Sequence, residues 1–271
     1  MNALWERPDF RRAAGDAWRP GGVELTGRAL DACASLGLLA QGGTVLDLGS
    51  GAGATLRLLA QRGYRAVGLD KHAECVSPAG VPLPCDACSL VRADLARPPL
   101  AAGCCDGVLC ECVLSLLDNP QAVLGAVFRA LRPGGALVVS DLMLRPGHDL
   151  APAACSCGPD GAEAVCGSAP AGAQSRVAVG SDGSVEDALK NSCLAGARPE
   201  SAWRGLITSA GFALQRYEDN SRALVELAAR MLWYGEGDSR PSGSCACRGV
   251  GAGRPWRAYG YGLWIARKEA L

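Results

Sequence analysis

Residues 44–53 read TVLDLGSGAG, and this stretch decides the fold. Its apolar beginning is typical of a buried parallel strand. Gly49, Gly51 and Gly53 then allow a tight turn and a close approach of the backbone to a ligand. A helix predicted over residues 54–62 would point its unpaired N–H groups and its positive end at an anionic group. The stretch therefore predicts a strand, a glycine turn and a helix around a cofactor pocket.

Two classes of cofactor use such a turn, and Asp47 helps to choose between them. Gly49, Gly51 and Ala54 satisfy the G-x-G-x-x-[G/A] pattern of dinucleotide folds, so an NAD(P) site stays open as an alternative. The Asp47 carboxylate, two places before the first glycine, would accept a hydrogen bond from an ammonium group and repel a pyrophosphate. The string D-x-G-x-G-x-G, which includes Ser50, resembles motif I of the class I S-adenosylmethionine-dependent methyltransferases. Their cofactor carries an α-amino group and a sulfonium.

Composition narrows the class of partner. The 271 residues, enough for one sizeable domain, include 27 basic and 27 acidic ones, so the formal net charge is zero. This balance indicates no surface for nucleic acid or an anionic membrane. No apolar run approaches the length that spans a bilayer, and the first twenty residues hold no signal-peptide core. We therefore expect a cytoplasmic protein that acts on a small molecule, without nucleic-acid or membrane partners.

Strands and helices alternate along the chain on both sides of the glycine turn. A helix over residues 25–39 leads into the first strand, and Gly42 and Gly43 end it. Further strands are predicted at residues 65–70, 91–94, 106–112, 136–141, 211–217 and 259–268, and further helices at residues 121–131, 199–210 and 221–234. Such alternation implies a parallel sheet with right-handed crossovers.

Five motifs in a fixed order carry a more specific resemblance: VLDLGSGAG, GLD, RADL, CDGVLCECVLSLLDNP and FRALRPGGALVVSD. Together they are similar to class I S-adenosylmethionine-dependent methyltransferases of the ubiquinone-biosynthesis and arsenite-methylating type. The resemblance covers about residues 25–145. It implies an α/β fold with a Rossmann-like, doubly wound sheet of seven strands, mostly parallel with an antiparallel last strand. It also implies S-adenosylmethionine as the cofactor.

The ends of later strands are expected to supply further cofactor contacts. Asp70 ends the second strand about 20 positions past the glycine turn, where doubly wound folds bind the ribose hydroxyls. An aspartate there also caps helices, which is the alternative. The resemblance places the adenine at Asp94 and Leu95, although these two residues also have the composition of an ordinary loop start. Lys71 and Cys110 complete the predicted cofactor set.

Two features concern the substrate side. Glu111 lies at the end of the fourth strand, beyond which this family normally holds its substrate. It is the candidate general base if the acceptor holds a proton, and a carboxylate at a helix start otherwise. The turn-rich residues 18–22, WRPGG, either fold over the cofactor as a lid or simply precede a helix.

The chain is predicted to form a single methyltransferase domain over residues 1–271, with its core at residues 25–145. Residues 146–197 lose all periodicity and read as a cysteine- and glycine-rich insertion. Residues 198–271 return to regular elements, which the resemblance implies would cover the substrate side.

Fourteen cysteines in an expected reducing compartment indicate free thiols or soft-ion ligands rather than disulfides. Three close pairs are predicted in loops near the carboxyl edge of the sheet: Cys85 with Cys88, Cys155 with Cys157, and Cys245 with Cys247. These pairs would hold a structural metal such as zinc or, as the resemblance to arsenite methyltransferases implies, a trivalent metalloid substrate. Loop cysteines with no shared task are the third interpretation, and no residue is assigned to a metal.

The predicted function is therefore S-adenosylmethionine-dependent methyl transfer to a small-molecule acceptor, which includes thiophilic species such as a metalloid, a thiol or a selenium compound. Such a transfer is an in-line displacement at an activated carbon, so the protein mainly aligns the reactants and excludes water. Two alternatives remain. One is an NAD(P)-dependent Rossmann oxidoreductase, and the other is a cysteine-rich metal-binding protein with a degenerate cofactor pocket.

Overall fold

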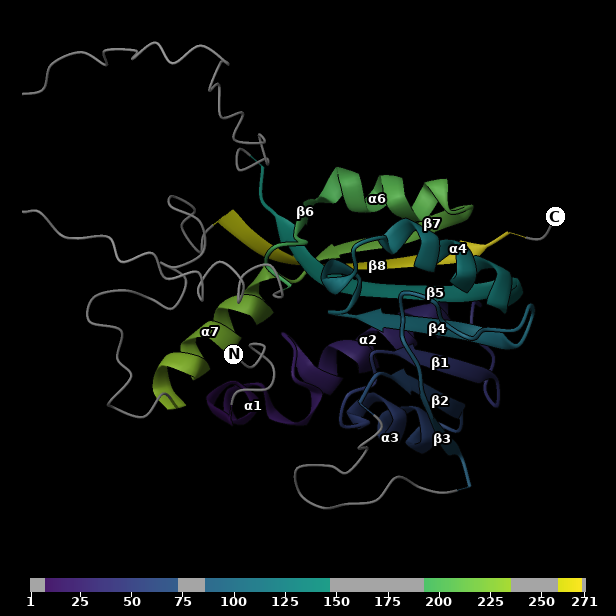
Figure 1. Ribbon diagram of the computed structural model, residues 1–271, viewed down its shortest axis with the longest axis horizontal. Coiled ribbons are helices and arrows are strands. Elements are labelled where there is room, and N and C mark those ends of the chain that lie inside the picture. Colours follow the sequence, from purple (N-terminus) through teal and green to yellow (C-terminus); the bar gives the residue numbers. More distant parts are fainter. Residues whose placement is uncertain (1–7, 73–85, 147–192, 235–257, 270–271) are drawn as a thin grey trace, which may run out of the picture.

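The computed structural model of the protein describes residues 8–72, 86–146, 193–234 and 258–269 (Figure 1). Its strands are β1 (Thr44–Leu48), β2 (Arg65–Asp70), β3 (Cys88–Arg92), β4 (Cys105–Glu111), β5 (Leu131–Leu144), β6 (Arg198–Pro199), β7 (Phe212–Asp219) and β8 (Tyr259–Lys268). Its α-helices are α1 (Pro8–Ala14), α2 (Gly22–Ser35), α3 (Ala54–Gln61), α4 (Pro120–Ala130), α6 (Glu200–Ser209) and α7 (Ser221–Tyr234). Two short 3-10 helices are η2 (Gly15–Ala17) and η3 (Leu114–Leu116).

The described strands form one sheet, in which seven strands follow the order β3-β2-β1-β4-β5-β8-β7 and the two-residue β6 pairs with β5. β8 runs antiparallel to both of its neighbours, while the other pairings are parallel. The strand order reverses between β1 and β4. In doubly wound sheets the ligand lies beyond the carboxyl ends of the strands at such a reversal. The predicted fold class, a doubly wound α/β sheet with an antiparallel last strand, is confirmed.

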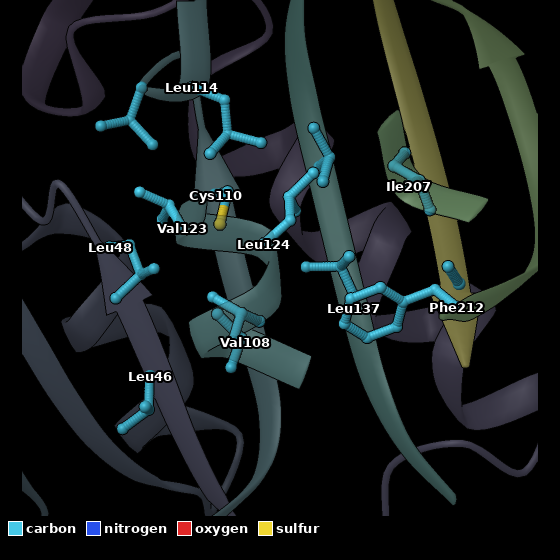
Figure 2. Packing of buried hydrophobic residues seen from close by; sticks show 14 of the residues in the cluster. Leu46, Leu48, Val108, Cys110, Leu114, Val123, Leu124, Leu137, Ile207 and Phe212 are labelled. Carbon is cyan, nitrogen blue, oxygen red and sulfur yellow. The ribbon is translucent and has the colours of Figure 1, made fainter. Parts of the chain in front are cut away.

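Two apolar layers bury the faces of the sheet. On one face, residues of α4 and α6 pack on the sheet, as Figure 2 shows for Val123, Leu124 and Ile207. On the other face, residues of α2 and α3 form the second layer. Alternate residues of β4 enter different layers, with Val108 in the first and Leu109 in the second. Because both faces are covered, these strands read as continuous apolar runs in the sequence.

α1 and α7 lie together beyond the end of the sheet at which β4 terminates, at the left of Figure 1. Phe10 and Ala13 of α1 pack on Leu227 of α7, and Trp18 joins this small cluster. The amino-terminal segment therefore lies at the carboxyl edge of the parallel strands. Among the described helices, none is both long and apolar enough to cross a membrane.

Several elements have the predicted bounds, among them β2, α7 and β8, whereas α2 starts and ends earlier than predicted. Gly21 caps the start of α2 in left-handed backbone, and Gly37, with φ of 67°, follows its end. Glycine takes up that backbone without strain, so the WRPGG segment and Gly37 bound the helix.

Two strands also differ from the prediction. β3 begins and ends earlier, because it pairs in register with residues 66–70 of β2. β5 is longer at both ends than predicted, since its pairing with β8 continues as far as Leu144 opposite Tyr259. The predicted insertion at residues 146–197 lies mostly outside the described residues.

Candidate functional site

The glycine turn joins the carboxyl end of β1 to α3. The amides of Gly49 and Ser50 donate to the carbonyl of Leu69 in β2 at 2.8 and 3.3 Å. Gly49, Gly51 and Gly53 have φ values of 78°, 49° and 74°, in the left-handed region that favours glycine. Gly53 is the N-cap of α3, so the unpaired amides of that helix begin at the turn. The predicted strand, glycine turn and helix are all present.

Close packing holds this turn in place. A Cβ on Gly49 would lie 2.8 Å from Cγ2 of Val113, which follows β4. A Cβ on Gly68 of β2 would lie 2.6 Å from Oγ of Ser50. The turn is therefore packed between β2 and the segment after β4. The sequence reading singled out neither Gly68 nor Val113, because each matters through a neighbour distant in the sequence.

Asp70 lies at the end of β2 and touches the turn. Its Oδ2 accepts a hydrogen bond from the amide of Gly51 at 2.9 Å, and its Oδ1 accepts one from the amide of His72 at 2.8 Å. This side chain therefore ties β2 to the glycine turn, next to the place predicted for the ribose. Lys71 is exposed, and its carbonyl accepts a hydrogen bond from Arg92.

Asp94 and Leu95 lie just beyond β3, at the same edge of the sheet. Asp94 is exposed, and its Oδ1 accepts a hydrogen bond from the amide of Ala96 at 2.9 Å. Leu95 is buried, and its Cδ1 would lie 3.8 Å from a Cβ on Gly49. The structure thus brings Leu95 to the glycine turn, while the Asp94 carboxylate shapes the local backbone.

Asp47 is buried, with 3 % of its surface exposed. Burial, together with repulsion from Glu111, raises the pKa of Asp47 to about 8, although Arg19 opposes the shift. Near neutral pH this carboxyl group is therefore largely protonated. A cation placed beside it would favour the charged form.

Glu111 is held by three side chains at the end of β4. Its Oε2 pairs with Nη2 of Arg19 at 2.7 Å and accepts a hydrogen bond from Thr55 at 3.1 Å, while its Oε1 accepts one from Thr26 at 2.8 Å. Arg19 Nη2 also donates to Thr26 and, at 3.0 Å, to Thr55. This buried network ties α2, α3 and β4 together, and it gives Glu111 the surroundings of a positioning residue.

Trp18 lies directly on the glycine turn. A Cβ on Gly51 would be 3.3 Å from the Trp18 ring, and the guanidinium of Arg11 lies 4.2 Å from the centre of that ring. Trp18 has left-handed backbone with φ of 51°, which is unfavourable for a tryptophan. The segment predicted as a lid is thus folded over the turn, with Trp18 outside and Arg19 inside.

Cys112 follows Glu111, and its thiol is hydrogen-bonded to the thiol of Cys193. Both side chains are half-buried, and both are reduced. Cys112 also has left-handed backbone, with φ of 58°. The hydrogen bond to Cys193, together with burial, raises the pKa of the Cys112 thiol well above its usual value. The two thiols therefore meet at the carboxyl end of β4.

Side chains from β5 and β8 lie beside this thiol pair. Tyr261 is buried, and its hydroxyl lies 3.1 Å from Oγ of Ser140, whose carbonyl accepts a hydrogen bond from the amide of Cys112. Asp141 accepts hydrogen bonds from the amide and hydroxyl of Ser115, at 3.0 and 2.6 Å. These contacts fix the backbone on both sides of Cys112.

The predicted thiol candidates are mostly outside this region. Cys88 begins β3, opposite Ala66 near the start of β2, so it lies in a strand at the amino edge of the sheet. The prediction that it belongs to a loop at the carboxyl edge is wrong, because β3 starts three residues earlier than its apolar pattern indicated. Cys85, Cys155, Cys157, Cys245 and Cys247 lie outside the described residues. Within those residues, no group of three or more metal-ligating side chains occurs.

Cys110 is fully buried in β4, where Figure 2 shows it beside Val123 and Leu124 of α4. Its thiol belongs to the core, so a ligand at the carboxyl edge would meet its backbone. Cys112, two residues later, points to the opposite layer. The sequence reading missed the pairing of Cys112 with Cys193, since the two thiols are 81 positions apart and Cys193 sits in a stretch without periodicity.

Comparisons with known proteins match the part of the chain that holds the glycine turn. A family model described as a methyltransferase domain matches residues 46–139. An arsenite methyltransferase from Halobacterium salinarum is 33% identical over 111 residues, which cover 39% of this chain and 28% of the relative. A second arsenite methyltransferase, from Aquipseudomonas alcaligenes, is 35% identical over 117 residues, or 38% of this chain and 34% of the relative. The chain thus spans about a third of the length of these curated relatives.

A solved structure has a similar fold. Phosphoethanolamine N-methyltransferase 2 of Haemonchus contortus, in complex with phosphomonomethylethanolamine and S-adenosylhomocysteine, superposes with a TM-score of 0.60 at 14% identity. The likeness covers 97% of this chain and 57% of that one. The segment that the methyltransferase family model matches, residues 46–139, begins in β1 and ends in β5. It includes the glycine turn, Asp70 and Glu111. Residues 46–139 therefore match a methyltransferase domain, within a fold like that of class I S-adenosylmethionine-dependent methyltransferases.

Proposed function

We propose that this chain methylates a small thiophilic acceptor with S-adenosylmethionine, and that Cys112 and Cys193 hold the acceptor. The observation that carries the proposal is the contact between these two thiols at the carboxyl end of β4, one residue after Glu111. Glu111 is in turn bonded to Thr55 in the first turn of the helix that follows the glycine turn. The thiol pair and the cofactor turn are thus linked through one short network.

The residues at the turn fit the cofactor. Three glycines with positive φ bring the backbone close to a ligand, and the side chain of Val113 fills the space in which a Cβ on Gly49 would lie. The buried Asp47 suits the α-ammonium group, because a nearby cation stabilises the carboxylate that burial disfavours. In this proposal Asp70 binds the ribose and Leu95 contacts the adenine. In this proposal Glu111 orients Arg19 and the helix start, and it acts as a general base only for an acceptor that carries a proton.

The thiol pair suits a trivalent metalloid such as arsenite. Sulfur is a soft donor, and two thiols replace two hydroxyls of arsenous acid, so that each displaced hydroxyl leaves as water with a thiol proton. The high pKa of the Cys112 thiol means that its proton leaves with the displaced hydroxyl rather than in advance. Reduced thiols are needed for this chemistry, which fits the cytoplasmic location predicted from the sequence. Two curated relatives are named arsenite methyltransferases, which supports the same acceptor class.

The chain's own residues have to align the reactants and exclude water. Bound S-adenosylmethionine supplies a methyl group activated by a sulfonium. Trp18 covers the turn from outside, while Tyr261 and Ser140 support the backbone of Cys112. Such fixed placement is the main source of rate enhancement in a displacement that needs no covalent intermediate.

Radiolabelled methyl transfer to a panel of arsenite, selenite, a small thiol and a quinol tests the proposal. Cys112→Ser and Cys193→Ser should each lose transfer to arsenite while binding S-adenosylhomocysteine as the unchanged protein does. Cys88 is a half-buried thiol at the other edge of the sheet, so Cys88→Ser should keep both methyl transfer to arsenite and binding of S-adenosylhomocysteine. Methyl transfer to the quinol alone, at a rate that neither cysteine substitution changes, would contradict the proposal of a thiophilic acceptor. Binding of NADH without S-adenosylhomocysteine would favour the oxidoreductase, and bound metal without methyl transfer would favour the metal-binding alternative.

A further inference from the structure

Arg19 carries a buried donor that the surrounding protein leaves unused. The residue is 6% exposed; its Nη1 donates to the carbonyl of Ala17 at 3.1 Å, and its Nη2 pairs with Glu111. Nε belongs to the same planar group and is buried, yet it has no partner among the described residues. Buried N–H groups without an acceptor are rare, because they have lost their water. An acceptor is therefore expected beside Arg19 when the site is in use.

The chemistry of the site indicates which acceptor. A methionine-derived cofactor carries an α-ammonium group and an α-carboxylate on one carbon. Asp47 suits the ammonium group, whereas a guanidinium binds a carboxylate through charge-assisted hydrogen bonds in a planar fork. Arg19 lies near Asp47 and contacts Glu111 and Thr55 of α3.

We infer that Arg19 binds the α-carboxylate of S-adenosylmethionine through its free Nε–H, and that it thereby selects for a cofactor that carries this carboxylate. The inference rests on the proposed function and extends it from the turn to the amino-terminal segment. Trp18 supports the assignment, since its backbone is strained and its indole N–H is also buried without a partner among the described residues. Strained backbone that persists in a structure commonly marks a binding site.

Arg57 is the rival candidate. Its Nη1 donates to the carbonyl of Ala52 in the turn at 3.2 Å, and its Nη2 is also buried without a partner in the described part of the chain. Its surroundings differ, however. Arg57 acts electrostatically on the thiol of Cys88 in β3, while Arg19 acts on Asp47 in β1. Arg19 is therefore the cation on the side of the ammonium-binding carboxyl group.

Calorimetric titration with S-adenosylmethionine and with decarboxylated S-adenosylmethionine separates these possibilities, because the two ligands differ only in the carboxylate. The unchanged protein should prefer the carboxylated ligand by about tenfold or more, the range of a charge-assisted hydrogen bond. Arg19→Gln and Arg19→Lys should reduce this preference to within about threefold. Arg19→Gln also leaves Glu111 buried without a cation, which can unfold the protein. If it does, Arg19→Lys is the deciding variant, because it keeps the positive charge and lacks the Nε–H.

Arg62→Gln is the matched control, since Arg62 also joins α2 to α3 through an ion pair, with Asp31, but does so at the far end of α3. It should keep the full preference, as should Arg57→Gln. If Arg19→Lys retained the full preference for the carboxylated ligand, the assignment of Arg19 to the α-carboxylate would be overturned. Loss of that preference in Arg57→Gln would overturn it as well. An equal loss of affinity for both ligands in the Arg19 variants would reduce Arg19 to a structural role. An unchanged protein that bound neither ligand would contradict the proposed function itself.

Discussion

Replacement of Asp47 by asparagine gives the most direct measure of how the turn recognises its cofactor. Burial raises the pKa of Asp47 to about 8, so the fraction of free protein with a charged Asp47 is about 1% at pH 6 and about a quarter at pH 7.5. If the bound cofactor requires the charged form, affinity should rise about twentyfold between these pH values. The α-ammonium group of the cofactor, with a pKa near 8, stays mostly protonated over this range.

The assay is calorimetric titration of S-adenosylhomocysteine at pH 6.0, 6.75 and 7.5 in buffers of equal ionic strength. Asp47→Asn preserves the shape of the side chain and removes the titration, so its affinity should change by less than about threefold over the range. A flat profile in the unchanged protein would refute the reasoning. An equal slope in Asp47→Asn would do so as well, because it would assign the proton to another group.

The same carboxyl group sets the stability of the cofactor-free protein. Its pKa in the folded state lies above the ordinary value of 3.8, so the folded state holds the proton longer than the unfolded state does. The contribution of this raised pKa to the stability of the folded protein is therefore fully present below about pH 4, and it is lost as the pH rises to about 8. In urea denaturation, the free energy of unfolding of Asp47→Asn should rise relative to that of the unchanged protein as the pH increases from about 4 to about 8.

Two further substitutions probe the turn. Gly68→Ala should destabilise the protein by about 1–3 kcal/mol in urea denaturation, because its Cβ would lie 2.6 Å from Ser50 Oγ and 2.7 Å from Leu56 Cδ1. The matched control Gly205→Ala, in α6 with nothing within 4 Å of its Cβ, should be neutral or stabilising, and equal losses at both positions would count against the packing argument. Asp70→Ala should weaken S-adenosylhomocysteine binding by about tenfold with an unchanged circular dichroism spectrum, and unaltered affinity would remove the ribose assignment.

Local patterns were enough to predict the sheet and the cofactor turn. The alternation of apolar runs and helical faces determines the layers, and Asp47, Gly49 and Asp70 lie within a few residues of the strand ends that position them. The antiparallel strand β8 could be placed because the resemblance supplied its pairing. The bounds of β3 could not be predicted, since its exposed residues carry little apolar signal and its start depends on pairing with Ala66.

The substrate side could not be predicted in the same way, because its contacts join distant parts of the chain. Glu111 looked free in the sequence, yet Arg19, 92 positions earlier, neutralises it. Cys112 read as the last residue of a strand, and its partner Cys193 belongs to a stretch whose composition predicts no structure. Arg19 itself was part of a glycine-containing turn, and nothing local marks an arginine that will be buried.

The position of β8 inside the sheet has a consequence for biosynthesis. Although β8 is the last described strand in chain order, it separates β5 from β7 and pairs with both along most of their lengths. While the ribosome is still making residues 259–268, the nascent polypeptide carries two strands with open edges, which are the surfaces that recruit other chains. Tyr261, beside the thiol pair, arrives with that same strand, so the surroundings of Cys112 and the closure of the sheet are completed in one step.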